Sequence, residues 1–205
     1  MSAKIKTLSP KQRLLRESSR IFGEKGFRGA SVREICMAAD TSSNMIHHYF
    51  GSKQGLYDAV VDQFSEAVFE VPMRVIAGKP ANVDGFSTRL QIFFEESLVA
   101  LIANRQFYEL ANRERLVVPS FADYNSSIIA FLEAGKEIGV VRADLDSEMI
   151  TGLIMDRLGP QVYYSEQIIE LLGESLLQDG PYRARWMKAN FEFILNGILD
   201  DNARG

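Results

Sequence analysis

The fold of this chain is decided by residues 31–56, SVREICMAADTSSNMIHHYFGSKQGL, which carry several helix start and stop signals in a short space. Ser31 stands three residues before Glu34, which is the pattern of a capping box at the start of a helix. Ser42 and Ser52 are placed to cap two further helices. Apolar residues recur between these serines at helical spacing. The stretch therefore predicts two short helices joined by a brief turn, followed by the start of another helix.

A longer helix precedes this stretch. The segment 9–12, SPKQ, combines a capping serine, a proline at the first helical position and a glutamine three residues after the cap. Gly26 supplies a left-handed stop. Two short helices that lean on a longer one form a helix-turn-helix unit. A fourth helix, expected over about residues 53–71, supports this small unit and links it to the rest of the chain.

Charge is divided unevenly along the chain. The net charge of the whole sequence is −4, but residues 1–53 hold ten Lys and Arg against four Asp and Glu, a balance of +6. The remaining residues therefore carry a balance of −10. A basic N-terminal segment followed by an acidic remainder is the charge asymmetry expected of a module that binds a polyanion and is attached to a different kind of domain.

Beyond Pro72 the sequence predicts only helices. They are expected over about residues 84–102, with Asp84 as the cap, and then over 106–115, 119–139, 147–172 and 181–199. Gly159-Pro160 is expected to kink the fourth of these helices. The predicted fold class is therefore all-α. The predicted domains are residues 1–53, an N-terminal arm with the helix-turn-helix, and residues 54–205, a larger helical domain.

Several short motifs follow one another within residues 11–62. They are Ile21-Phe22, Glu24-Lys25-Gly26-Phe27, Ser31-Val32-Arg33-Glu34-Ile35, Ala38-Ala39, Ser42, Ile46, and Tyr49-Phe50-Gly51-Ser52-Lys53 followed by Leu56. In this order they resemble the DNA-binding domain of the TetR family of bacterial transcriptional regulators. The resemblance covers about a quarter of the chain. It implies a one-component regulator, most often a repressor, whose helical body dimerises and binds a small-molecule effector.

The outward residues of the third helix are the candidates for reading DNA. A helix that enters a major groove about 12 Å wide needs compact, hydrogen-bonding side chains, and Asn44 suits the edge of an adenine. The resemblance implies that His47, Tyr49 and Lys53 contact phosphates and that Arg33 reaches the DNA beside them. Without the motif, each of these polar residues would be interpreted as a solvated helix surface. The predicted contact set is Ser31, Arg33, Ser42, Ser43, Asn44, His47, His48, Tyr49 and Lys53.

Three positions depart from the usual pattern of the family. Asp40 replaces a glycine in the turn, and Asp tolerates the left-handed conformation that the turn needs. Asn44 stands where glycine is common, and His47 where tyrosine is common. These departures leave the fold intact and leave the operator sequence undetermined.

The body of the chain is rich in aromatic residues, which at helical spacing are ordinarily core residues. Together they also suit the lining of an apolar cavity. By resemblance, an effector pocket lies in this body, and fatty-acyl, aromatic or drug-like effectors would suit it. The candidate lining is Phe64, Phe93, Phe94, Phe107, Tyr108, Phe131 and Tyr163.

Two helices near the end of the chain carry wide apolar stripes, which either pack within the chain or meet a second copy of it. By resemblance, such helices form a dimer interface. A dimer lets its two helix-turn-helix units contact successive major grooves of a palindromic operator. The candidate interface is Leu153, Ile154, Leu158, Ile168, Leu172, Phe191, Ile194, Leu195 and Ile198.

Other functional classes fit the sequence less well. His47 and His48, the only histidines, diverge by about 100° on a helix and do not chelate one metal ion together. An all-α enzyme is a further alternative, but the sequence lacks the histidines of a di-iron site and has no phosphate loop. We therefore expect no enzymatic activity, no metal and no cofactor. Cys36 is expected to be a buried apolar residue, and a single cysteine fits a reducing, cytoplasmic setting.

Neither a membrane span nor a secretory signal is expected from the sequence. The remaining alternative is a DNA-binding regulator without a small-molecule effector, which is controlled by a protein partner or serves an architectural role.

Overall fold

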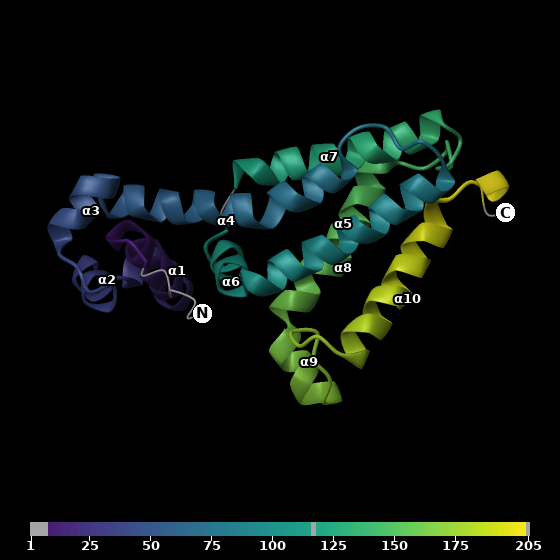
Figure 1. Cartoon of the computed structure of the whole chain (residues 1–205). Helices are drawn as coiled ribbons and strands as arrows, with labels where there is room; N and C mark the ends of the chain where they lie inside the picture. Colours follow the sequence, from purple (N-terminus) through teal and green to yellow (C-terminus); the bar gives the residue numbers. More distant parts are fainter. Residues whose placement is uncertain (1–7, 116–117, 204–205) are drawn as a thin grey trace, which may run out of the picture. The chain divides into compact units, whose positions relative to one another are not determined.

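The computed structural model describes residues 8–115 and 118–203, and these form an all-α fold, as predicted (Figure 1). An isolated antiparallel β-bridge joins Val141 and Leu199. The helices are α1 (Pro10–Gly29), α2 (Val32–Ala38), α3 (Ser43–Phe50), α4 (Lys53–Ile76), α5 (Val83–Ala103), α6 (Arg105–Glu114), α7 (Pro119–Glu137), α8 (Ser147–Tyr163), α9 (Ser165–Leu172), α10 (Pro181–Ile198) and the short 3₁₀ helix η1 (Asp201–Ala203).

The chain divides into two compact units. The first consists of Met1–Glu66 and Gln106–Val117, and the second of Ala67–Arg105 and Val118–Gly205. The first unit thus takes in the first half of α4 and nearly all of α6. The predicted boundary after residue 53 lies inside this unit.

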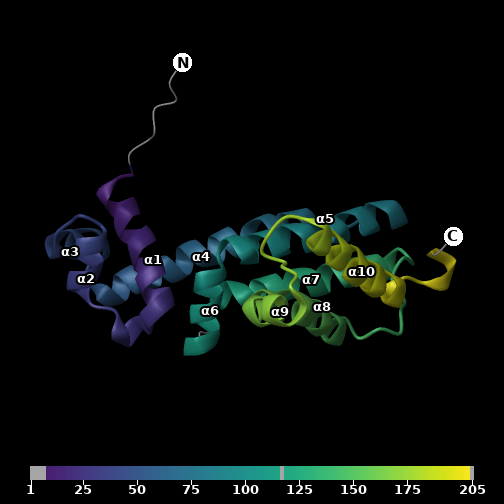
Figure 2. The same cartoon turned by 90° about the horizontal axis from the view of Figure 1, so that it is seen from below.

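In the first unit, α1, α2 and α3 contact one another and form the three-helix arrangement (Figures 1 and 2). Each helix turns apolar side chains inward because its apolar residues recur with the helical period. The innermost side chains, each at most 1% exposed, include Leu14, Ile21, Phe22, Ile35, Ile46 and Leu56. The opposite faces of α2 and α3 are left free to carry polar residues.

Nearly all of helix α6 also belongs to the first unit. Leu110 is fully buried. A Cβ atom built at Gly23 of α1 would lie 3.2 Å from the carbonyl oxygen of Gln106. The absence of a side chain at Gly23 therefore allows the start of α6 to approach α1 closely.

The helix starts in the first unit are fixed mainly by serines. Ser9 and Gln12 form the predicted capping box, with bonds of 3.3 Å and 2.9 Å. Ser52 accepts a hydrogen bond from the N–H of Gly55 at 3.0 Å, as predicted for a cap of α4. Ser31 caps α2, but the second half of the predicted box is wrong. The Glu34 carboxylate accepts instead from Lys25 Nζ at 2.5 Å, because an ammonium group lies within its reach.

Left-handed backbone occurs at the turns of this unit. Gly26 has φ = 71° and kinks α1, which resumes for one more turn instead of stopping there. Asp40 has φ = 48°, so the aspartate adopts the left-handed conformation expected of it between α2 and α3. Gly51, with φ = 74°, ends α3.

The second unit is built around α5 and α8. Helix α8 contacts α5, α7 and α9, and α10 packs on α5 (Figure 2). Phe86 and Phe131 stack with their ring centroids 4.7 Å apart and their planes 2° from parallel. The core also holds Leu90, Phe93, Phe94, Ile154 and Leu158, all fully or almost fully buried. Burial of these side chains supplies most of the favourable free energy of folding in this unit.

Three boundaries differ from the sequence-based expectation. Asn82, not Asp84, caps α5, because its side-chain oxygen reaches the N–H of Gly85 at 2.8 Å. Helix α4 continues past Pro72 to Ile76. The helix expected over residues 147–172 is broken at Tyr164, four residues after Pro160, where a C-cap bond joins the Tyr164 N–H to the Pro160 carbonyl.

A buried polar pair lies in the core of the second unit. Ser97 donates a hydrogen bond to the carbonyl oxygen of Phe93 at 2.6 Å, and its oxygen lies 2.7 Å from the hydroxyl oxygen of Tyr124. Since the single Ser97 proton is used toward Phe93, Tyr124 is the donor to Ser97. Burial raises the pKa of Tyr124, and the bond to Ser97 only partly opposes that effect, so the phenol stays neutral.

Candidate nucleic-acid interface

The polar face predicted on the helix-turn-helix is present and exposed. Helix α3 is anchored by Ile46, which is 1% exposed, and its other side is polar. Ser43, Asn44 and His47 share that side because they are one and four residues apart. The predicted contact residues that are exposed are Ser31, Arg33, Ser42, Ser43, Asn44, His47 and His48, while Tyr49 and Lys53 are half-buried.

His47 is oriented by the end of its own helix. Its Nδ1 lies 3.0 Å from the carbonyl oxygen of Gly51, and because a carbonyl only accepts, Nδ1 carries the proton. The ring is thereby fixed with Nε2 as its second polar atom. The His48 and Tyr49 rings meet edge to face with centroids 4.9 Å apart. These contacts restrict the side chains at the C-terminal end of α3 before any ligand binds.

Ser42 occupies the N-cap position of α3 but does not cap it. Its backbone has the extended conformation of an N-cap residue, yet its hydroxyl makes no capping hydrogen bond. The predicted capping role of Ser42 is therefore wrong, and the exposed hydroxyl remains available for other contacts.

Arg13 supports the turn of the helix-turn-helix, which sequence reasoning did not anticipate. From α1 it donates to the carbonyl oxygens of Ala39 at 2.9 Å and Asp40 at 3.1 Å, and to that of Leu8 at 3.2 Å. The first two acceptors form the turn between α2 and α3. One planar guanidinium thus ties the turn to α1, which sets how α3 is presented. No local sequence signal links positions 26 and 27 residues apart.

Lys53 is held inside the unit instead of extending freely. Its Nζ donates to the carbonyl oxygen of Phe27 at 2.5 Å and lies 4.5 Å from the centroid of the Phe27 ring. An ammonium group has three N–H donors. At least one donor is therefore committed within the protein, and the ammonium is fixed at the start of α4.

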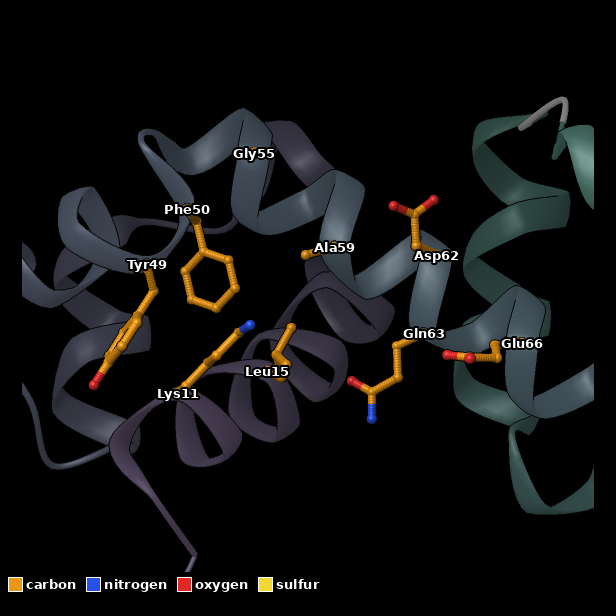
Figure 3. Close-up of a pocket in the computed structure, with 9 residues that line it drawn as sticks. All are labelled: Lys11, Leu15, Tyr49, Phe50, Gly55, Ala59, Asp62, Gln63 and Glu66. Carbon is orange, nitrogen blue, oxygen red and sulfur yellow. The ribbon is translucent and has the colours of Figure 1, made fainter.

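An open groove of about 540 Å³ runs between α1, α3 and α4 (Figure 3). Lys11 and Tyr49 lie at one end of this groove, with Phe50 and Leu15 beside them, and acidic residues lie toward the other end (Figure 3). The complete lining is Lys11, Leu15, Tyr49, Phe50, Gly55, Ala59, Asp62, Gln63 and Glu66. Lys11 was not among the predicted contacts, and it adds a cation to the lining of this groove.

In the described part of the chain, no group of three or more His, Cys, Asp and Glu side chains is arranged to hold an ion. Cys36 is buried, as predicted, and its burial raises the pKa of the thiol. A neutral, buried thiol is a poor nucleophile and a poor ligand.

The residues predicted to line an effector pocket are distributed over both units. Phe64 and Tyr108 belong to the first unit. Phe93, Phe94 and Phe131 are buried in the second unit, and Tyr163 is exposed on α8. The side chain of Phe107 lies outside the described residues. The rings of Phe69 and Tyr124, two further aromatic residues of the body, lie 4.8 Å apart in the second unit.

The predicted interface residues fall into three groups by exposure. Ile154, Leu158, Ile194 and Ile198 are buried in the core of the chain itself, whereas Leu153 and Leu172 are more than half exposed. Ile168, Phe191 and Leu195 are intermediate.

Other apolar side chains are exposed near Leu153 and Leu172. They include Met149 on α8, Leu171 on α9 and Phe193 on α10. The Arg157 guanidinium of α8 lies 5.7 Å from the Phe193 ring, which places the two helices side by side at that point. Exposed apolar side chains are thus present on α8, α9 and α10.

No helix in residues 8–115 and 118–203 is both long enough and apolar enough to cross a membrane.

Comparison with known proteins agrees with this geometry. Residues 14–60, which cover most of α1, all of α2 and α3 and the start of α4, match the family described as bacterial regulatory proteins, tetR family. Among curated proteins, the repressor KstR2 of Rhodococcus jostii is 24% identical over 156 residues, covering 70% of this chain and 73% of the relative. The regulator UidR of Escherichia coli is 25% identical over 153 residues, covering 70% and 75%.

Solved structures extend the likeness to nearly the whole fold. The ketosteroid transcriptional regulator KstR2 of Mycobacterium tuberculosis superposes with a TM-score of 0.69 at 24% identity, covering 96% of this chain and 98% of that one. The TetR family regulator PfmR of Thermus thermophilus gives 0.69 at 21% identity, covering 90% and 97%. Residues 14–60 thus carry a helix-turn-helix domain of the tetR family of bacterial regulatory proteins, and the chain as a whole has the all-helical fold of the solved regulators that it superposes on.

Proposed function

We propose that the chain represses transcription as a homodimer that binds a palindromic operator and leaves it when a small-molecule effector binds. The observation that carries this proposal is the exposed polar face of α3, in which Ser43, Asn44 and His47 lie opposite the buried Ile46. A helix with such a face fits the major groove, and base edges are read by side chains of this kind.

The contacts divide into two classes. Asn44 and Ser43 read base edges, because an amide can pair with adenine through two hydrogen bonds and a hydroxyl can donate or accept. His47, Tyr49 and Lys53 contact phosphates on one side of α3. Arg33, exposed on α2, reaches the DNA beside them. Phosphate contacts set affinity and orientation, and base contacts set the preferred sequence.

Lys11, which is not in the contact set predicted from the sequence, is a further phosphate contact. It lies with Tyr49 at one end of the groove between α1, α3 and α4 (Figure 3). It is exposed, so its ammonium can reach a polyanion without the cost of displacing an internal partner.

The surface formed by Met149, Leu153 and Phe193 on α8 and α10 is the contact between the two copies. These side chains are 63%, 56% and 70% exposed, which is unusual for large apolar residues unless a partner covers them. A symmetric dimer also supplies a second helix-turn-helix unit, because one such small unit makes too few contacts with DNA for sequence specificity. Ile154, Leu158, Ile194 and Ile198 support this surface from beneath and do not belong to it.

The effector is a largely apolar molecule with at least one polar group. The interior of the second unit offers aromatic rings, including those of Phe69 and Phe93, around the Ser97–Tyr124 hydroxyl pair. Apolar walls with a few fixed polar groups are the usual composition of ligand sites. A steroid ketone and a long-chain fatty acyl compound are the first candidates to test, the former because KstR2 is named a ketosteroid regulator.

Selection of bound sequences from a random duplex pool tests the function. We expect the purified protein, at fixed moderate salt, to enrich a palindrome whose half-sites lie about 10 base pairs, or a multiple of that, apart. Addition of an effector is then expected to release the enriched duplex, by favouring the state that binds DNA less well. Failure of a folded dimer to enrich any sequence would contradict the proposal.

A further inference from the structure

Helix α6 contributes one carboxylate to the unit that carries the helix-turn-helix. Glu114 Oε1 accepts a hydrogen bond from the backbone N–H of Phe27 at 2.7 Å, and Oε2 accepts one from the hydroxyl of Tyr57 at 3.1 Å. Glu114 is 87 residues from Phe27 in the sequence. One side chain of α6 therefore ties the end of α1 to α4.

Phe27 is held at both ends of its backbone. Its N–H is bonded to Glu114, and its carbonyl oxygen accepts from Lys53 Nζ at 2.5 Å. The Phe27 ring also lies beneath the Lys53 ammonium, at 4.5 Å from the ring centroid. Glu114 and Lys53 do not touch in this arrangement. They are connected through Phe27.

The local backbone makes room for the carboxylate. Gly26 has φ = 71° and interrupts α1 immediately before Phe27. A Cβ atom built on Gly26 would collide with Glu114 Oε1. A glycine at this position therefore serves both the left-handed backbone and the approach of the carboxylate.

The ring of Phe27 is also fixed in orientation. It meets the Tyr57 ring at a centroid distance of 5.0 Å and an angle of 64°, and Tyr57 meets Phe22 at 5.0 Å and 86°. Tyr57 and Phe22 are both buried. Since Glu114 bonds to the Tyr57 hydroxyl as well, it holds the ring cluster and the backbone of Phe27 together.

We propose that Glu114 is a positioning residue for DNA binding, which acts through Phe27 to place the Lys53 ammonium where it meets a phosphate. This inference rests on the proposed function, which makes Lys53 a phosphate contact. A lysine side chain loses rotamer freedom when it is fixed by a ligand. A Lys53 ammonium that the protein already holds loses less freedom on binding DNA, which strengthens binding.

The test compares salt dependence of duplex binding for the full chain and four variants. Glu114→Ala removes both acceptors. Glu114→Gln is the matched control, since its amide oxygen still accepts from Phe27 and its NH₂ group donates to the Tyr57 oxygen. Lys53→Ala removes the phosphate contact itself, and the double variant Glu114→Ala/Lys53→Ala reports whether the two act on one contact.

We expect Glu114→Ala to lower the slope of log affinity against log salt by up to about 0.9 for each phosphate that the protein no longer neutralises, with two such phosphates in a complex with a dimer. Glu114→Gln should keep the slope of the unsubstituted protein, and the double variant should match Lys53→Ala. An unchanged slope in Glu114→Ala would overturn the proposal. So would a further decrease in slope when Glu114→Ala is added to Lys53→Ala.

A second measurement needs no DNA, so that failure of the proposed function and failure of this inference give different results. The Lys53 ammonium lies over the Phe27 ring, so the protons of its terminal methylene carry a ring-current shift that NMR detects. We expect Glu114→Ala to move these shifts toward ordinary lysine values and Glu114→Gln to leave them in place. Tyr57→Phe removes only one of the two bonds to Glu114, and it should produce a smaller change in the same direction if Glu114→Ala fails to fold. Unchanged Lys53 shifts in a folded Glu114→Ala or in Tyr57→Phe would overturn the inference.

Discussion

The Arg13 guanidinium donates a hydrogen bond to the carbonyl oxygen of Asp40 across 3.1 Å, and one to the carbonyl of the neighbouring Ala39 across 2.9 Å. Asp40 has a left-handed backbone with φ = 48°, where a glycine would be under less strain. The turn between α2 and α3 is thus bonded to α1 through two consecutive carbonyl groups. We interpret these bonds as the support for a turn that contains no glycine.

Arg13→Ala is expected to loosen the turn. Loss of charge-assisted hydrogen bonds to backbone carbonyls should destabilise the first unit by about 1.5–3 kcal/mol. Amide hydrogen exchange, read at residues 39–41 of the full chain, checks this prediction locally. Arg16→Ala on the same helix is the control, because its exposed pair with Glu17 should contribute about 0–1 kcal/mol. Equal exchange rates in the two variants would contradict the role of Arg13.

Asn44→Ala and Lys53→Ala are expected to weaken DNA binding in different ways. A good bidentate amide–adenine pair discriminates against the wrong base by about 1–3 kcal/mol, so Asn44→Ala should relax the preferred sequence. Lys53→Ala should weaken binding to all sequences equally and lower the salt slope by about 0.9 per phosphate. Titration of both variants against the enriched duplex and a scrambled one separates the effects. An equal loss of sequence preference in both would contradict the division into base and phosphate contacts.

Leu153→Glu and Phe193→Glu are each expected to convert the dimer into a monomer. A carboxylate placed at the centre of an apolar contact must lose its hydration without gaining a partner. Sedimentation velocity at micromolar concentration measures the change. Val99→Glu on α5 serves as the control, since Val99 is also about half exposed but lies outside the proposed surface. A dimer that survives both substitutions would place the interface elsewhere.

Cys36 is expected to resist thiol reagents at neutral pH. Burial raises the pKa of the thiol, and the thiolate is the reactive form, so the folded protein presents little of it. The reaction with a disulfide reagent should be slow at pH 7, should accelerate only as the pH rises well above the usual thiol range, and should be fast in denaturant. Rapid modification of the folded protein at pH 7 would mean that the thiol is accessible.

Ser97→Ala is expected to cost more stability than Tyr124→Phe. The serine substitution leaves the buried Tyr124 hydroxyl without its acceptor, and an unsatisfied buried polar group costs about 1–3 kcal/mol. Tyr124→Phe removes the donor and leaves Ser97 still bonded to the carbonyl of Phe93. The double variant should be no less stable than Ser97→Ala alone, as measured by denaturant unfolding. A larger loss in Tyr124→Phe would contradict this order.

Much of the first unit could be predicted because its signals are local. The Ser9–Gln12 capping box, the left-handed Asp40 and the exposed polar face of α3 each depend on residues a few positions apart. Periodicity also separated Ile46, which is buried, from Asn44, which is exposed.

The parts that could not be predicted depend on long-range contacts. Arg13 bonds to a turn 26 and 27 residues away, and Glu114 bonds to Phe27 across 87 residues. Nothing local in the sequence of α6 assigns it to the first unit. Similarly, the apolar stripe of α8 does not reveal that Ile154 faces the core while Leu153 faces outward. Neighbouring residues of a wide stripe are told apart only by the helices that pack on them.

The most direct test of the central claim is a hydroxyl-radical footprint of the full chain on the enriched duplex. The claim is that two copies of the α3 face, each carrying Asn44 and His47, occupy successive major grooves. We predict two protected patches related by a two-fold axis, with half-site centres about 10–10.5 base pairs, or a multiple of that, apart on one side of the helix. A single protected patch, or even protection along the duplex, would contradict the account.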